Sequence, residues 1–167
     1  DRRWAIEREG WANVPNNIGD PECLKWTTER VCRVLRENRV EMYREDNNSD
    51  PAALWQYLDE REGENRRGIT ECKFVMGHYQ MWDDIIACTL GHGGCGFVDS
   101  CASGGGRNDL ESMRRGVPLL RSDNDRTSAA LRLSMTTAFN RWIPFCGANT
   151  KEKLGQLDPR GESDPYV

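Results

Sequence analysis

The sequence predicts an α/β fold, a fragment of a (β/α)8 TIM barrel that lacks the first strands and the last part. Strand-like and helix-like patterns alternate along the chain, which indicates βα units and a parallel sheet. A complete barrel typically needs about 250 residues, whereas this chain has 167 residues and about four strand-like segments. Conspicuous polar groups follow three of these strands, and in such barrels function gathers at the carboxyl ends of the strands.

Each element rests on a local signal. The first helix has Asp20 as N-cap and Pro21 at its first position, and its apolar face ends near Asn38. Asp50 is the expected cap of the next helix. The further helical patterns lie at 51–58, 73–90, 109–115 and 128–141. The strand-like segments lie at 39–44, 96–100, 117–121 and 143–148.

These elements predict one partial catalytic domain followed by a tail. Residues 1–150 form the partial TIM-barrel domain, and the polar residues 151–167 lead toward the missing remainder. We expect the isolated fragment to be inactive and poorly stable, because an opened barrel exposes its sheet edges.

Composition excludes several classes of partner. The net charge of −4 disfavours nucleic acid as a partner. No apolar run approaches the roughly 20 residues of a membrane span, and the charged start, 1-DRRWAIEREGW-11, has no signal-peptide pattern. The seven cysteines form an odd set without a CxxC pair, which favours free thiols and a cytoplasmic location. With two histidines and no ligand spacing, neither a metal nor another cofactor is expected.

The most unusual stretch is 99-DSCASGGGRNDLE-111, in which three consecutive glycines follow a strand. Glycines allow a backbone to approach a ligand closely. A phosphate is excluded as that ligand, because no GxxxxGK[ST] motif occurs. The one GxGxxG match, 91-GHGGCG-96, follows a helical pattern and precedes a strand, the reverse of the dinucleotide-binding order. Asp109 is the expected N-cap of the short helix that follows the glycines.

Two carboxylates follow strands on either side of this stretch. Asp46 and Asp123 have the residue type and position of the carboxylate pair of a glycoside hydrolase. An aspartate in a polar turn is more often a turn former or a helix cap, so spacing alone leaves both interpretations open.

Several motifs in order resemble one family of enzymes. The matching stretches are 40-VEMYREDNNSDP-51, 68-GITE-71, 82-WDD-84, 99-DSCASGGGRNDLE-111 and 117-VPLLRSD-123. Over about residues 4–149 the chain resembles the melibiase-type α-galactosidases of glycoside hydrolase family 36. The resemblance implies a retaining hydrolase of carbohydrate metabolism that releases terminal α-linked galactose from oligosaccharides without a cofactor, and an assembly into homo-oligomers. An α-N-acetylgalactosaminidase, a transglycosylase and a non-catalytic sugar-binding barrel remain alternatives.

The resemblance also implies roles for single residues. Asp46 corresponds to the nucleophile and Asp123 to the acid/base, while Arg44 and Asn48 correspond to residues that contact sugar hydroxyls. The remaining residues implied to bind substrate are Cys101, Gly104, Gly105 and Ser122. For Cys101, a small buried thiol without a sugar contact is an equal alternative.

Overall fold

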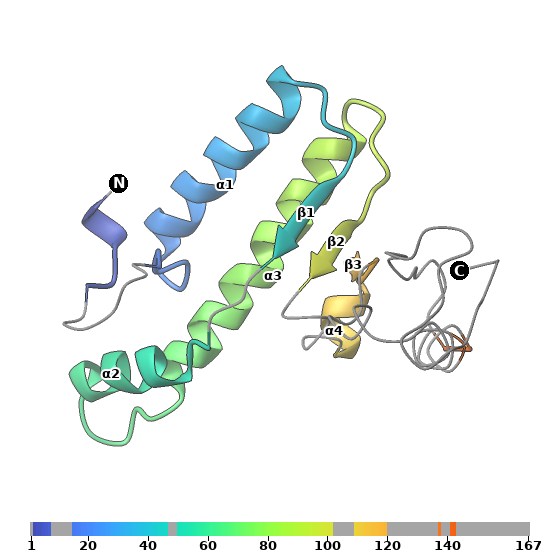
Figure 1. The fold of residues 1–167 in the computed structure, drawn as a ribbon. Coiled ribbons are helices and arrows are strands. Elements are labelled where there is room, and N and C mark those ends of the chain that lie inside the picture. Colours follow the sequence, from blue (N-terminus) through green and yellow to red (C-terminus); the bar gives the residue numbers. More distant parts are fainter. Residues whose placement is uncertain are drawn as a thin grey trace, which may run out of the picture. The chain divides into compact units, whose positions relative to one another are not determined.

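The structure is a computed structural model that describes residues 2–7, 15–46, 50–101, 109–119, 137 and 141–142. The chain divides into two units, each described by itself. A helical unit comprises residues 1–43 and 49–96, and a sheet unit comprises residues 44–48 and 97–167. Figure 1 labels the elements of both units.

The helical unit begins with a short 3-10 helix, η1 (Arg2–Trp4). Ala5 then pairs with Asn16 in an isolated antiparallel bridge. The first long helix, α1 (Pro21–Glu37), begins where the sequence predicts, because the Asp20 carboxylate accepts hydrogen bonds from the main-chain N–H groups of Glu22 and Cys23 at 2.8 and 3.0 Å.

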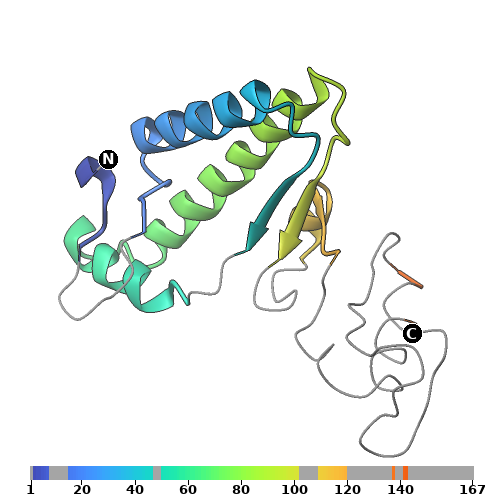
Figure 2. The same ribbon diagram turned by 45° about the horizontal axis from the view of Figure 1, so that its top comes forward.

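Helix α1 lies beside the longest helix, α3 (Ile69–Leu90), as Figures 1 and 2 show. The closest backbone approach is at Gly77 of α3, where an added Cβ would lie 2.2 Å from the carbonyl oxygen of Ile18. A larger residue would therefore force the two segments apart. The core of this unit contains buried residues of both helices, namely Cys23, Cys32, Leu35, Met81, Trp82 and Ile85.

Helix α2 (Ala52–Glu62) packs on α3, with the rings of Trp55 and Phe74 5.6 Å apart. The N-cap of this helix is Pro51, without a side-chain capping hydrogen bond, so the predicted N-cap, Asp50, lies one residue too early. Its carboxylate accepts a hydrogen bond from the N–H of Ala52 at 3.0 Å. The helix continues one turn beyond the expected end at residue 58, so the charged loop is shorter than predicted.

Helix α3 also begins earlier than the sequence pattern predicts, at Ile69 instead of residue 73. The reason is a distant cap, because the buried carboxylate of Asp59 accepts hydrogen bonds from the N–H groups of Gly68 and Thr70. These bonds satisfy donors that the first turn leaves free. Hydrogen bonds from the Thr70 side chain and from these two N–H groups lower the pKa of Asp59.

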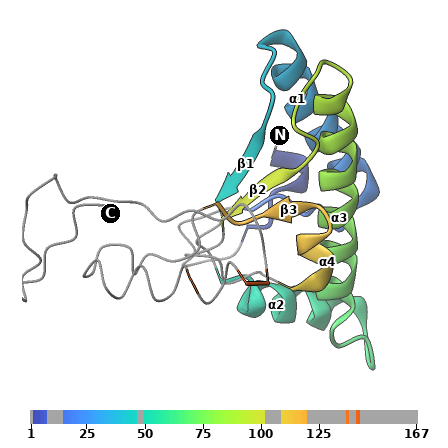
Figure 3. The same ribbon diagram turned by 90° about the vertical axis from the view of Figure 1, so that its right-hand side faces the viewer.

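The described part of the sheet unit contains three short strands, β1 (Tyr43–Asp46), β2 (Val98–Cys101) and β3 (Gly116–Val117). They form one parallel sheet in the order β1-β2-β3, visible edge-on in Figure 3. Val98 is paired with Gly116 and Asp99 with Val117. Gly116 is required here, because a Cβ would lie 2.9 Å from the carbonyl oxygen of Val98. Tyr43, the first residue of β1, belongs to the helical unit.

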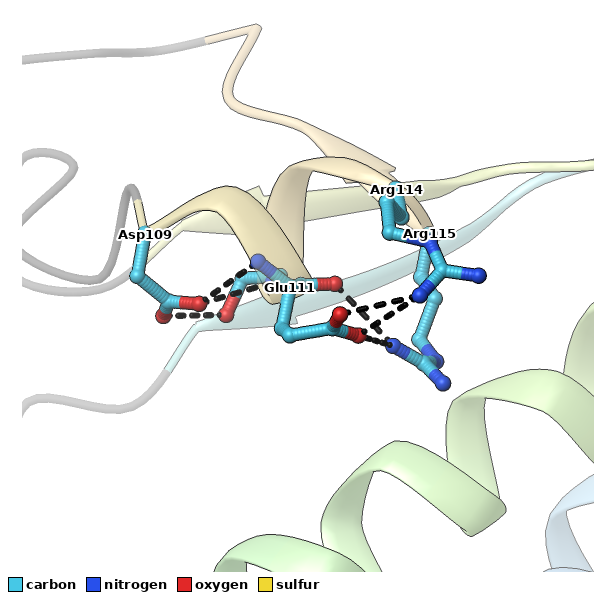
Figure 4. Close-up of polar contacts among 5 residues, drawn as sticks. Asp109, Glu111, Arg114 and Arg115 are labelled. Carbon is cyan, nitrogen blue, oxygen red and sulfur yellow. Dashed lines mark hydrogen bonds and ion pairs between the residues drawn. The ribbon is translucent and has the colours of Figure 1, made fainter.

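The short helix α4 (Leu110–Met113) connects β2 to β3. Its N-cap is Asp109, as predicted, with hydrogen bonds of 2.9 Å from the N–H groups of Glu111 and Ser112 (Figure 4). The Ser112 hydroxyl donates to the same carboxylate, and the Glu111 side chain accepts hydrogen bonds from Arg114 and Arg115.

The predicted TIM-barrel fragment is wrong. The described residues form an open sheet of three parallel strands whose outer strands, β1 and β3, are edges, and the longest of these strands has four residues. Closure into a barrel requires tilted strands that pair on both sides with a constant stagger. The first strand also begins later than predicted, at Tyr43. The predicted helix at 128–141 lies outside the described residues except for Thr137, which is helical, and Arg141, which is in a turn. The predicted strand at 143–148 and the tail at 151–167 lie outside them entirely.

Candidate functional site

The candidate site starts from the alternation of side chains along β1. Tyr43 and Glu45 are half-buried, whereas Arg44 and Asp46 are exposed. Because side chains two residues apart on a strand lie on the same face, Arg44 and Asp46 share one face of the sheet. Asp46 is the last residue of the strand, at its carboxyl end.

The neighbouring strand supplies a buried acid. Asp99 of β2 is 3% exposed, and one of its carboxylate oxygens accepts a hydrogen bond from Arg44 Nη1. Its other oxygen accepts the N–H of Leu119 at 3.1 Å, just beyond β3. A buried carboxylate is stable only with such partners, and through them Asp99 of β2 connects β1 with the segment that follows β3.

The contact with Asp99 also has the largest effect on the pKa of Arg44. The hydrogen bond from Arg44 to Asp99 raises the pKa of the guanidinium, partial burial lowers it by a smaller amount, and the nearby Asp46 carboxylate raises it further. Arg44, Asp46, Asp99 and Cys101 are therefore close enough to interact electrostatically at one face of the sheet. The guanidinium is hydrogen-bonded to Asp99, while the Arg44 side chain keeps 39% of its surface exposed.

Cys101 is the last residue of the central strand β2, the neighbour of β1 in the sheet. Its side chain is buried, with 6% exposed. It lies two residues after Asp99 and hence on the same face of the sheet. Of the predicted site residues, the structure brings together Arg44, Asp46 and Cys101.

The other predicted site residues are not described. They are Asn48, Gly104, Gly105, Ser122 and Asp123. In the sequence, Asn48 lies two residues after the end of β1. Gly104 and Gly105 follow β2, and Ser122 and Asp123 follow β3. Their interactions with the described cluster stay predictions.

Sequence reasoning missed Asp99 as a member of the site. A signal was present, because an acid inside the apolar segment 97-FVDSC-101 must find a buried partner if the segment is a strand. The partner itself could not be predicted locally, since Arg44 lies 55 residues earlier in the chain.

The described residues contain neither a metal-binding group nor a membrane-spanning helix. Among them, no group of three or more His, Cys, Asp or Glu side chains is arranged to hold a metal ion. No described helix has both the length and the apolar character needed to cross a membrane.

The fold and side chains together define a parallel-sheet protein with a charged cluster at the carboxyl ends of its strands. In open parallel sheets, ligands bind outside these ends. Comparison with known protein families, curated proteins and solved structures found no match for this chain.

Proposed function

We propose that this protein is a retaining glycoside hydrolase that releases terminal α-linked galactose from oligosaccharides. The observation that carries the proposal is the position of Asp46 and Cys101 at the carboxyl ends of two adjacent parallel strands. A sugar bound outside these ends would meet the Asp46 carboxylate and Cys101, from which the glycine-rich stretch 101-CASGGG-106 continues in the sequence. The motif resemblance to family 36 α-galactosidases supports the same reaction.

The proposed chemistry uses two carboxylates in two steps. The Asp46 carboxylate attacks the anomeric carbon, while Asp123 gives its proton to the leaving oxygen. In the resulting galactosyl ester, Asp46 no longer carries a charge. Asp123, now ionised, then removes a proton from the water that attacks the anomeric carbon and cleaves the ester. Such a retaining mechanism needs carboxyl groups about 5 to 5.5 Å apart.

Arg44 has a binding role in this proposal. Its contact with Asp99 fixes the guanidinium beside β2, and the exposed part of the guanidinium can donate hydrogen bonds to sugar hydroxyl oxygens. Asp99 thereby acts through Arg44, as a positioning residue.

Removal of the nucleophile tests the proposal. We expect Asp46→Gly in the full-length protein to lower the hydrolysis of an aryl α-galactoside at least about a thousand-fold, because no covalent intermediate can form. Azide should restore turnover in part and yield β-galactosyl azide, since it attacks from the face that Asp46 occupied.

Asp50→Gly is the matched control, because Asp50 is an exposed acid four residues further on that accepts a hydrogen bond from the N–H of Ala52 at the start of α2. This variant should keep its activity and give no galactosyl azide. Unchanged activity in Asp46→Gly without azide would contradict the proposal, whereas sugar binding without turnover in the wild-type protein would support a sugar-binding protein instead.

The proposal extends to a cytoplasmic location. Six cysteines of the described residues are thiols outside any disulfide, namely Cys23, Cys32, Cys72, Cys88, Cys95 and Cys101. Free thiols persist in a reducing compartment, which supports this location.

A further inference from the structure

Two of the free cysteines face each other between the helices of the helical unit. Cys32 lies on α1 and Cys88 on α3, and their thiols are within hydrogen-bonding reach of each other. Cys88 Sγ donates to the carbonyl oxygen of Cys32 at 3.4 Å. Cys32 Sγ donates to the carbonyl oxygen of Asp84 at 3.9 Å, one turn before Cys88. Each sulfur thus already contacts the backbone of the opposite helix.

The two thiols differ in their surroundings. Cys32 is buried, and burial together with its contact to Cys88 raises the pKa of its thiol to about 12. Cys88 is half-buried, and Arg36 Nη1 donates a hydrogen bond to its sulfur at 3.5 Å, at the surface. Cys88 is thus the more accessible of the two thiols and has a cationic hydrogen-bond donor against its sulfur, whereas burial keeps Cys32 a thiol.

We propose that Cys32 and Cys88 are a redox-active pair, in which a hydroperoxide oxidises Cys88 and a reversible disulfide then links α1 to α3. The Cys88 thiolate attacks one peroxide oxygen and becomes a sulfenic acid, while the other oxygen leaves as an alcohol or as water. Cys32 next attacks the sulfenic sulfur, and its proton leaves with the displaced hydroxide as water. For hydrogen peroxide, two thiols and one peroxide give one disulfide and two waters.

Burial and hydrogen bonding assign these roles. Arg36 donates a hydrogen bond to Cys88 from α1. For Cys32 burial is the largest cause that raises the pKa of the thiol, while the opposite charges of Arg36 and Asp84 oppose each other there. Cys88 is therefore the cysteine that reacts first. Cys23, also buried on α1, has its sulfur 3.9 Å from the Thr27 hydroxyl.

The cross-link would have a physical consequence for the helical unit. Cys32 and Cys88 are 56 residues apart in the sequence, so a bond between them removes much of the freedom of the unfolded chain. We expect the oxidised protein to melt at a higher temperature than the reduced protein, and dithiothreitol to reverse the shift. This inference does not depend on the proposed hydrolase activity.

The experiment treats the reduced full-length protein with hydrogen peroxide, blocks the remaining thiols and identifies linked peptides by mass spectrometry. The peptide 31-VCR-33 should be linked to the tryptic peptide 74–107, with fragmentation locating the bond at Cys88. The fragmentation is necessary because Cys95 and Cys101 lie in the same peptide. Urea-unfolded protein is the control, in which no single pairing should dominate.

Two variants separate the roles of the pair. In Cys32→Ser, dimedone should trap a sulfenic acid at Cys88, and in Cys88→Ser the link should disappear while Cys32 stays a thiol. Cys72→Ser, which changes an exposed cysteine of α3, should behave like wild type. Links dominated by another pair, or dimedone labelling at Cys72 or Cys95 in place of Cys88, would overturn the proposal.

Discussion

Asp99 has a hydrogen-bond partner on each side of its strand. It is buried, and its two oxygens bind Arg44 of β1 and the N–H of Leu119 after β3. An acid in this position either has both partners or costs stability, because desolvation of an unpaired carboxylate is unfavourable. Asp99 therefore contributes to the sheet and to the position of Arg44 at the same time.

Replacement of Asp99 tests this double role. We expect Asp99→Ala to lower the free energy of unfolding by about 1–3 kcal/mol, because it leaves the Leu119 N–H and the Arg44 guanidinium without their acceptor. Urea unfolding of wild type, Asp99→Ala, Arg44→Met and the double variant gives the coupling between the two side chains. Strictly additive effects would show that the contact contributes nothing to stability.

The helices of the helical unit depend on backbone contacts as much as on apolar side chains. Helix α1 could be predicted because its cap, Asp20, directly precedes it in the sequence. The start of α3 could not, because its cap, Asp59, lies in α2 and 11 residues before Thr70. Helix propensity likewise could not predict the close approach of α3 to Ile18 at Gly77.

A pair of glycine substitutions tests that approach. Alanine in place of a helical glycine usually stabilises by up to about 1 kcal/mol. At Gly77 the new Cβ would lie 2.2 Å from the Ile18 carbonyl oxygen, so we expect Gly77→Ala to destabilise by about 1–3 kcal/mol instead.

Gly91→Ala is the matched control. Gly91 has helical dihedral angles, with φ −61°, and its added Cβ would have only an ordinary contact, 3.4 Å from the Cys88 carbonyl oxygen. Thermal melts followed by circular dichroism should show a lower Tm for Gly77→Ala and an unchanged or higher Tm for Gly91→Ala. Equal melting temperatures for the two variants would mean that α3 is not held against Ile18.

Across the whole molecule, acid should destabilise both units. The pKa of Asp59 is lowered from 3.8 by its hydrogen bonds to Thr70 and Gly68, and that of Glu111 from 4.5 by hydrogen bonds from Arg115 and Arg114. A lowered carboxylate pKa stabilises the folded state above the unfolded pKa, and the contribution is lost as the pH falls through the folded pKa. Stability should therefore decline as the pH falls below about 4 to 5.

Urea midpoints between pH 7 and pH 2 measure this decline. The double variant Asp59→Asn, Glu111→Gln should start less stable at pH 7 and lose less stability with acid than wild type. Parallel curves for the two proteins would assign the acid sensitivity to other carboxylates.

The sequence predicted local elements better than the architecture. The cap of α4 at Asp109 and the strand before the glycines follow from neighbouring residues. Barrel closure was predicted wrongly because strand count and order depend on pairings between distant segments, which alternating local patterns do not specify. For the same reason Arg44, Asp46 and Cys101 could be named from motifs, whereas the contact of Arg44 with Asp99 could not.

The stereochemistry of galactose release tests the proposed hydrolase most directly. The full-length protein is mixed with an aryl α-galactoside, and proton NMR records which anomer of galactose appears first, before mutarotation equilibrates the two. Two successive displacements, with Asp46 as nucleophile, predict that α-galactose appears first. The appearance of β-galactose first would show a single displacement by water, and Asp46 would then not be the nucleophile.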